Sequence, residues 1–134
     1  MITAIDTNVL LDVFLPDPEF GETSFQLLRD AYDQGALVVS EIVYAELVPQ
    51  FEGKALLDET LAKMNIAFSS MDQRVAFLAG ERWGHYRKSG GKRKRIITDF
   101  LIGAHAKLHA DRLLTRDRGF YRQYFKELRL ISST

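Results

Sequence analysis

The N-terminal stretch Ile2-Thr3-Ala4-Ile5-Asp6-Thr7-Asn8 places three polar residues directly after a short apolar run. The run predicts a buried strand, and each of the three polar residues can cap a helix. Residues 9–15 continue with helical, mainly apolar character, and Pro16 and Pro18 end that helix. The chain therefore begins with a strand and a helix, with a carboxylate at their junction.

Short apolar runs and helical periodicities alternate along the rest of the chain. Further strands are predicted at residues 36–39, 66–68, 112–115 and 128–131, and further helices at 22–33, 41–48, 51–64, 72–86, 97–109 and 120–125. This alternation predicts an α/β fold, a three-layer α/β/α sandwich whose central sheet is mainly parallel. In such sheets the ligand site forms beyond the carboxyl ends of the strands.

Length and composition set limits on the kind of protein. A chain of 134 residues with 46% hydrophobic residues suits a single domain spanning 1–134. It contains no cysteine, which excludes disulfides, thiolate zinc sites and cysteine nucleophiles. No signal-like segment precedes the first apolar run, and no apolar stretch approaches the length of a membrane span. A soluble cytoplasmic protein is expected.

Four acidic residues stand where this fold would bring them together. Asp6 follows the first predicted strand and Asp117 follows the strand at 112–115, while Glu46 and Asp99 lie near the starts of predicted helices. Carboxylates gathered at one sheet edge repel each other unless a hard divalent cation neutralises them. We therefore interpret Asp6, Glu46, Asp99 and Asp117 as catalytic residues of a Mg²⁺ or Mn²⁺ site that acts on phosphate esters.

Each acid also has a structural interpretation. Asp6 and Asp99 could be simple helix caps, Asp117 a turn residue, and Glu46 a residue of a solvated helix face. Glu41 competes with Glu46 but has the position of a first-turn residue that the helix dipole stabilises. The four together favour the metal site more strongly than any one of them.

Two kinds of neighbouring side chain bear on this hypothesis. Asn8 and Thr115 each lie two residues from an acid, so they could orient Asp6 and Asp117, or serve only local turns. His105 and His109 are spaced to share a helix face, as in some metal sites. One packed histidine and one surface histidine is the interpretation we prefer for that pair.

The net charge of zero hides a basic segment. Residues 82–98 hold seven basic residues and no acid, so the rest of the chain carries a compensating negative charge. Its densest part is Lys92, Arg93, Lys94 and Arg95, shortly before Asp99. Such a run is often only a solvated loop, but beside an acid cluster it favours contacts with the phosphates of RNA.

The same residues resemble the PIN domain, the nuclease fold of the VapC toxins of bacterial and archaeal toxin–antitoxin pairs. Four marks along essentially the whole chain carry the resemblance. They are Asp6-Thr7-Asn8 after a strand, Ala45-Glu46-Leu47, Asp99 before the small-residue helix Phe100-Leu101-Ile102-Gly103-Ala104-His105-Ala106, and Thr115-Arg116-Asp117 with Phe120. No single mark is specific to the family, but the four marks in this order and at this spacing make a strong match.

The resemblance implies a metal-dependent ribonuclease with metal ligands at Asp6, Asp99 and Asp117 and with Glu46 completing the acidic cluster. It also implies a homodimer and an antitoxin partner whose tail covers the active-site groove. One departure concerns the third acid: many members have Leu-Pro shortly before it, whereas this chain has Arg95-Ile96-Ile97-Thr98. The departure bears on the path of the RNA rather than on the metal site.

Other functions stay open at this stage. The same fold could form a catalytically silent RNA-binding or interaction domain, or an RNA-processing nuclease without an antitoxin. A haloacid-dehalogenase-like phosphatase would place a second Asp two residues after the first, where this chain has Asn8. A receiver domain would pair adjacent acids near the N-terminus and carry a Lys after a late strand, and both features are missing from the sequence.

Overall fold

A parallel sheet forms the centre of the protein. The computed structural model describes residues 1–90 and 95–132. Across these residues five strands pair in the order β3-β2-β1-β4-β5, and every pairing is parallel. The strands are β1 (Ile2–Ile5), β2 (Ala36–Val39), β3 (Ile66–Phe68), β4 (Arg112–Leu114) and β5 (Leu130–Ile131). The predicted parallel sheet is confirmed.

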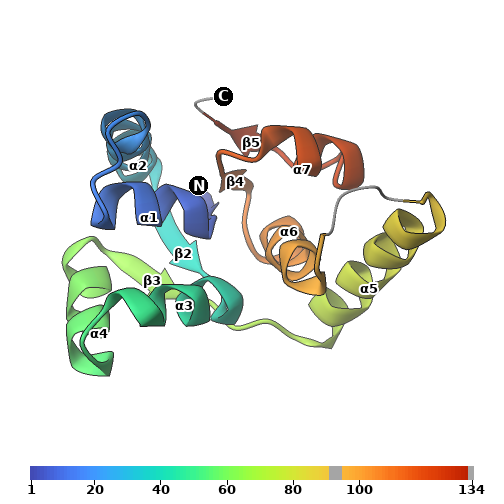
Figure 1. Cartoon of the computed structure of the whole chain (residues 1–134), viewed down its shortest axis with the longest axis horizontal. Coiled ribbons are helices and arrows are strands. Elements are labelled where there is room, and N and C mark those ends of the chain that lie inside the picture. The colour runs from blue at the N-terminus through green and yellow to red at the C-terminus, as the bar shows by residue number, and fades with distance from the viewer. Residues whose placement is uncertain (91–94, 133–134) are drawn as a thin grey trace.

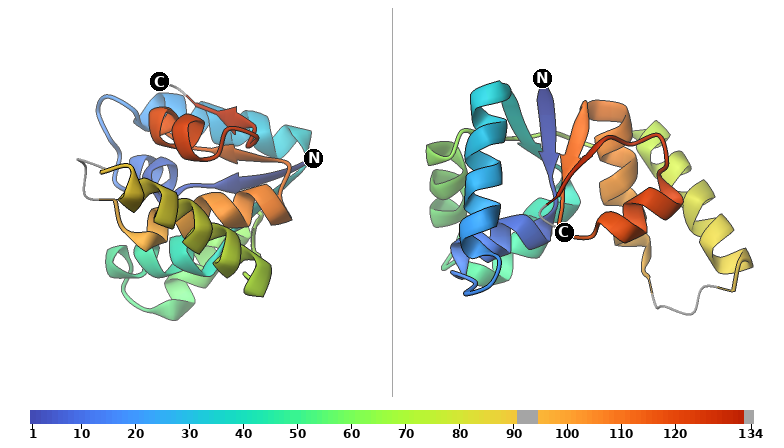
Figure 2. Two further views of the ribbon diagram at one scale, coloured as in Figure 1. Left: turned by 90° about the vertical axis from the view of Figure 1, so that its right-hand side faces the viewer. Right: turned by 90° about the horizontal axis from the view of Figure 1, so that it is seen from above.

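Helices cover both faces of this sheet. They are α1 (Thr7–Phe14), α2 (Gly21–Gln34), α3 (Glu41–Leu47), α4 (Lys54–Lys63), α5 (Gln73–Lys88), α6 (Ile97–His109) and α7 (Arg118–Tyr124), with a short 3₁₀ helix η1 (Val48–Gln50). Figure 1 shows α2 and α7 on one side of the sheet and α3 and α6 on the other, and the left-hand view of Figure 2 shows the same separation from the side. The α/β/α sandwich is therefore also confirmed.

The direction of chain growth reverses next to β1. The chain first builds outward through β2 and β3, and it then returns to the other side of β1 to form β4 and β5. At the carboxyl ends of β1 and β4 the backbone N–H of Asp6 donates to the carbonyl of Leu114 at 2.9 Å. A reversal of this kind opens a crevice at the carboxyl ends of the strands, which is where open α/β sheets bind ligands.

The core beneath the carboxyl ends of β1 and β4 is closely packed. All three residues of β4 are buried, and the rings of Phe100 in α6 and of Tyr121 and Phe125 at α7 are among the largest fully buried side chains. Gly103 allows the contact between α6 and the Phe125 ring, because a Cβ at this position would lie 2.6 Å from that ring. The elements that carry the site are thus fixed to the sheet by an aromatic core.

Several element boundaries differ from the predicted ones by one to three residues, as at the start of α4 and in the last strand. The helix expected over 51–64 begins at Lys54, because Gly53 before it has a φ of 108°, outside helical backbone. Pro49 lies in the separate 3₁₀ helix η1, which follows the end of α3 at Leu47. The last strand covers Leu130–Ile131 only, since the N–H of Leu128 bonds the Phe125 carbonyl in the turn that follows α7. None of these differences moves an acid of the proposed site. No helix within residues 1–90 and 95–132 is long and apolar enough to cross a membrane.

Candidate active site

Asp6 lies at the reversal point between β1 and β4, where extended backbone turns into α1. One carboxylate oxygen, Oδ1, accepts from the backbone N–H of Thr7 at 2.8 Å. The other, Oδ2, accepts from the hydroxyl of Thr115 at 2.7 Å and from that of Tyr121 at 3.2 Å. Asp6 is only 7% exposed, so it is held in one orientation by donors from three separate segments.

Burial sets the protonation behaviour of this carboxyl. Removal from water raises the pKa of Asp6 from 3.8 to about 6, and the nearby charge of Asp117 acts in the same direction. The hydrogen bonds from Thr115, Thr7 and Tyr121 lower the pKa, but not enough to offset burial. The negative charge of Asp6 at neutral pH is therefore a destabilising feature of the folded chain by itself.

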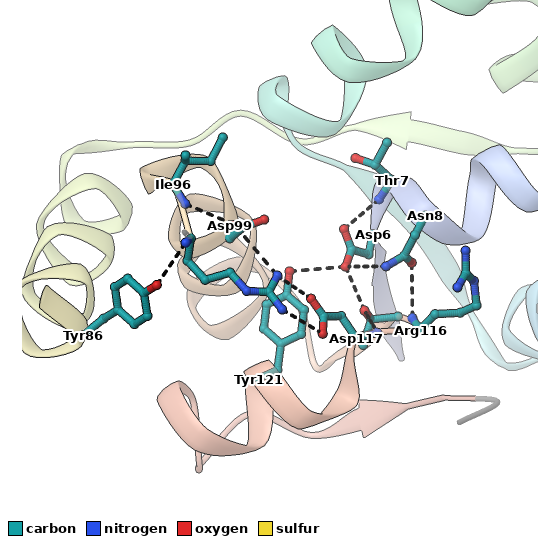
Figure 3. A network of polar contacts seen from close by, with 11 residues as sticks. Asp6, Thr7, Asn8, Tyr86, Ile96, Asp99, Arg116, Asp117 and Tyr121 are labelled. Atoms are coloured by element: carbon teal, nitrogen blue, oxygen red, sulfur yellow. Dashed lines mark hydrogen bonds and ion pairs between the residues drawn. The ribbon is translucent and has the colours of Figure 1, made fainter. Parts of the chain in front are cut away.

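Asp117 is tied to Asp6 through one hydroxyl. The backbone N–H of Asp117 donates to Oγ1 of Thr115 at 2.9 Å, and the same hydroxyl donates to Asp6. Thr115 therefore fixes two of the predicted acids relative to each other. The side chains around this link are drawn in Figure 3.

Asp99 approaches from the first turn of α6. Its Oδ2 accepts from the backbone N–H of Ile96 at 3.4 Å. Burial raises the pKa of Asp99, the charge of Arg95 lowers it, and the charge of Asp117 raises it. The negative charges of Asp99, on α6, and Asp117, at the start of α7, therefore repel each other.

Tyr121 stands among all three aspartates. Burial raises the pKa of its hydroxyl well above the usual value, and the charges of Asp6, Asp99 and Asp117 raise it further. Figure 3 shows these side chains coming together from the start of α1, from α6 and from α7. The fold thus brings together three of the four predicted acids, which lie up to 111 positions apart in the chain.

Glu46 is connected to Asp6 indirectly, through Thr7. It lies on α3, is exposed, and accepts at 2.6 Å from the hydroxyl of Thr7, whose backbone N–H bonds Asp6. Its competitor Glu41 instead accepts from the backbone N–H of Met71 at 2.8 Å, which is a structural contact. The distinction between these two glutamates drawn from the sequence thus agrees with their contacts.

Arg95 is the one residue of the predicted RNA-binding run that the structure describes. Its guanidinium makes two hydrogen bonds to Asp117, at 2.6 and 3.2 Å, and lies 3.9 Å from Oδ2 of Asp99. The other three members, Lys92, Arg93 and Lys94, lie outside the described residues. Arg95 therefore contacts the acid cluster itself, a pairing that the sequence analysis did not anticipate.

Asn8 connects the site to the β4–α7 junction. Its Nδ2 donates to Oδ2 of Asp6 at 3.4 Å, and its Oδ1 accepts from the backbone N–H of Arg116 at 3.2 Å. Both contacts appear in Figure 3. Asn8 thus combines the two predicted roles, since it contacts an acid and also serves local backbone structure.

The two histidines of α6 are engaged elsewhere. His105 is buried and its Nε2 lies 3.0 Å from the hydroxyl of Ser69, whereas the partly exposed His109 contacts Asp72 at 3.0 Å. This arrangement matches the preferred interpretation of one packed and one surface histidine.

The chain matches a known protein family in sequence and several solved structures in fold. A family model described as the PIN domain matches residues 3–126. The chain belongs to the PIN domain family. Its fold is similar to that of a chain in the VapBC2 complex of Rickettsia felis bound to a promoter DNA fragment, with a TM-score of 0.74, 21% identity and 98% of each chain covered. The VapBC-1 structure from nontypeable Haemophilus influenzae gives the same values.

A lower similarity in fold is found for VapC20 of Mycobacterium tuberculosis, a sarcin–ricin loop cleaving toxin. It has a TM-score of 0.53 and 12% identity, with 83% of this chain and 86% of that chain covered. No curated protein matches the chain. PIN domains are generally metal-dependent ribonucleases, so the family agrees with the chemistry expected of the acid cluster.

The donor atoms of the side chains at this site suit a divalent cation such as Mg²⁺ or Mn²⁺. The three aspartates offer the carboxylate oxygens that Mg²⁺ and Mn²⁺ prefer. Within the described part of the chain, no group of three or more His, Cys, Asp or Glu residues is placed to hold one ion together. Mg²⁺ commonly uses one or two carboxylates and keeps several waters, so one or two direct ligands suffice here.

Thr7 and Tyr121 are site residues that the sequence analysis did not single out. Thr7 stands between Asp6 and Glu46, and it is part of the Asp-Thr-Asn mark. Tyr121 follows Asp117 by four positions, which is the spacing that puts two side chains on one face of a helix. That spacing is a usable signal, although a tyrosine in an apolar helix usually indicates only core packing.

Proposed function

We propose that this PIN domain is an endoribonuclease that hydrolyses RNA phosphodiester bonds with Mg²⁺ or Mn²⁺ at Asp6, Asp99 and Asp117, one or two of which bind the ion directly while the others hold its waters. The observation that carries the proposal is the uncompensated charge of Asp6. Asp12, on the same helix, is 4% exposed and has a two-point ion pair with Arg116, at 2.7 and 3.0 Å. Among residues 1–90 and 95–132, by contrast, no basic side chain forms an ion pair with the buried Asp6.

A buried carboxylate without a cationic partner calls for an ion from outside. Burying a charge is unfavourable unless it is paired, and Asp6 is oriented by donors rather than neutralised. When bound, a divalent ion activates water and offsets the negative charge that develops on the phosphate. This chemistry requires no cysteine or histidine, in agreement with the composition and with the positions of His105 and His109.

The roles of the surrounding residues follow from their contacts. Thr115 holds Asp6 and Asp117 in a fixed relation, so that both carboxylates face the gap toward α6. Glu46 is exposed and is held by Thr7, which suits a base that orients or deprotonates the attacking water. Asn8 restrains the carboxylate of Asp6 from the side of α1.

Cleavage of an RNA oligonucleotide tests the proposal. With Mg²⁺ or Mn²⁺ the wild-type protein should cleave, and each of Asp6→Asn, Asp99→Asn and Asp117→Asn should abolish cleavage while the fold is retained. Asp33→Asn, at an exposed carboxylate on α2, is the matched control and should cleave normally. Cleavage that persists in excess EDTA would reject the metal role.

The alternative on the same fold is a catalytically silent RNA-binding domain. It predicts that the wild-type protein retains RNA on a filter without cutting it, at any divalent ion concentration. The mutual influence of Asp6, Asp99 and Asp117 favours the nuclease, because a surface that only binds RNA phosphates would not gather negative charge.

The basic run supplies the proposed RNA contacts. Neutralising Lys92, Arg93 and Lys94 together should weaken RNA binding and lower the slope of log affinity against log salt by on the order of two to three, about 0.7 to 0.9 for each lost phosphate contact. An unchanged slope would assign the run to an ordinary solvated loop.

We further propose that the protein is the toxin of a toxin–antitoxin pair and acts as a homodimer. The fold neighbours include VapBC complexes, and in the Rickettsia felis structure the complex is bound to promoter DNA. Co-purification with the product of a small adjacent gene that encodes a DNA-binding protein, together with loss of cleavage in that complex, tests the pairing. An isolated gene and an unregulated activity would instead favour an RNA-processing nuclease without an antitoxin.

A further inference from the structure

The guanidinium of Arg95 lies against two of the proposed metal-binding carboxylates. It bonds both oxygens of Asp117, at 2.6 and 3.2 Å, and its NH1 lies 3.9 Å from Oδ2 of Asp99. The Arg95 side chain is 21% exposed, and Asp99 and Asp117 are 31% and 32% exposed. Arg95 thus bridges the carboxylates of α6 and of the α7 start with a single positive charge.

This position of Arg95 is built into the fold. Its backbone N–H donates at 3.0 Å to the hydroxyl of Tyr86, a residue of α5 that is 7% exposed. Its guanidinium lies 4.4 Å from the centroid of the Phe120 ring, which supplies a cation–π contact from α7. A planar guanidinium with two parallel bonds to a carboxylate has a more defined position than a surface lysine would have.

A divalent cation and this guanidinium require the same oxygen atoms. The bonds from Arg95 engage both oxygens of Asp117, so only the remaining lone pairs of this carboxylate are open to a cation while the guanidinium is in place. The two positive charges would also repel each other at contact distance. Arg95 and a metal ion at this carboxylate therefore disfavour each other.

We propose that Arg95 is an internal counter-ion that competes with the divalent cation for Asp99 and Asp117, so that metal binding is weakened while its guanidinium is bound to Asp117. The inference rests on the proposed function, because it concerns regulation of the same site. It means that the chain itself sets the free metal concentration at which the site fills. The opposite role, a fixed support that holds Asp117 ready for the ion, predicts weaker metal binding when Arg95 is removed.

Direct Mn²⁺ binding to the full chain separates these roles without any measurement of activity. The free Mn²⁺ signal in electron paramagnetic resonance gives the dissociation constant of wild type, Arg95→Gln and Arg95→Lys at one pH and ionic strength. Arg95→Gln should bind Mn²⁺ on the order of tenfold more tightly, from the loss of a partly buried two-point ion pair. Arg95→Lys keeps the charge without the two-point geometry and should fall between the two.

The chain provides a matched control pair. Arg82 in α5 bonds Glu127 at 2.7 Å with similar exposure, 26% and 39%, and its guanidinium lies 5.3 Å from the centroid of Phe125. Arg82→Gln removes a comparable guanidinium–carboxylate pair away from the acid cluster, and it should leave Mn²⁺ affinity unchanged. Circular dichroism of each variant verifies that the fold is retained.

The outcomes separate this inference from the proposed function. Equal or weaker Mn²⁺ binding by folded Arg95→Gln, with RNA cleavage by wild type intact, overturns the competition and leaves the nuclease assignment standing. Tighter binding by Arg95→Gln, with no RNA cleavage by wild type at saturating Mn²⁺, supports the competition and overturns the nuclease. Failure of both proteins to bind Mn²⁺ at millimolar concentration overturns both.

Discussion

Replacement of the buried Asp6 by Asn should change how stability depends on pH. In the folded chain burial raises the pKa of Asp6 to about 6, above the value of 3.8 for an exposed side chain. Between these two values the folded state binds more protons than the unfolded state. The free energy of unfolding of the wild type must therefore fall as the pH rises through this window.

The size of the effect follows from the same two values. At about 1.4 kcal/mol for each pH unit, the charged form of Asp6 destabilises the fold by about 3 kcal/mol in total, and about 1.4 kcal/mol of this falls between pH 5 and pH 8. Asn has the same shape and cannot ionise. The stability of Asp6→Asn relative to wild type should therefore increase by about 1.4 kcal/mol between pH 5 and pH 8.

Urea unfolding followed by circular dichroism, in EDTA at several pH values, measures this difference. A constant offset from altered hydrogen bonds with Thr115 and Tyr121 cancels, because only the change with pH is compared. Asp33→Asn, at an exposed position, should run parallel to wild type. If the free energy of unfolding of Asp6→Asn changes with pH as that of the wild type does from pH 5 to pH 8, burial does not raise the pKa of Asp6 as we assign.

Replacement of Asp12, the other buried aspartate discussed above, should change the free energy of unfolding in the opposite direction at neutral pH. Asp12 accepts two bonds from Arg116 and one from the hydroxyl of Ser24 at 2.7 Å. Asp12→Asn removes a paired charge, so it should destabilise the protein at pH 7 by on the order of 1–3 kcal/mol. Stabilisation by both substitutions would mean that pairing does not distinguish these two carboxylates.

Two further predictions concern packing and the Asp6 hydrogen bonds. Gly103→Ala should lower the free energy of unfolding by about 1–3 kcal/mol, because the added Cβ meets the Phe125 ring, whereas Gly84→Ala in α5 meets nothing within 4 Å and should raise it by up to about 1 kcal/mol. Urea unfolding of both variants checks the pair, and equal effects would contradict the contact. Tyr121→Phe removes a donor that lowers the pKa of Asp6, so the acidic limb of the pH–rate profile for RNA cleavage should move to higher pH, and an unmoved limb would show that the bond has no influence.

The fold and the proximity of Asp6 to Asp117 could be predicted from the sequence because they depend on local patterns. Short apolar runs such as Ile2–Ile5 and Ala36–Val39 alternate with helical periodicity, and a parallel sheet follows from that alternation. Asp6 and Asp117 follow neighbouring strands, so the rule on carboxyl ends was sufficient to bring them together. The element boundaries near Pro49 were wrong by a few residues, because a 3₁₀ turn there is not encoded by periodicity.

The partners inside the site could not be predicted in the same way. Arg95 is four residues before Asp99, which suggests that pair, but its stronger partner Asp117 lies 22 positions later in the chain. Glu46 has apolar neighbours in sequence and yet is exposed, because its short helix presents only part of its surface to the sheet. Such contacts depend on how α6 and α7 pack against each other, and no local pattern specifies that packing.

The start of helix α7 contacts both Arg95 and Asp6. Asp117 precedes its first residue, and Phe120 and Tyr121 follow at spacings of three and four, which place all three side chains near one face. Phe120 lies beneath the guanidinium of Arg95, and Tyr121 donates to Asp6. The internal cation and the buried carboxylate are thus attached to the same turn of helix. Arg95 and Asp6 therefore share one support, since the turn that packs Phe120 against the guanidinium also aims the Tyr121 hydroxyl at the carboxylate.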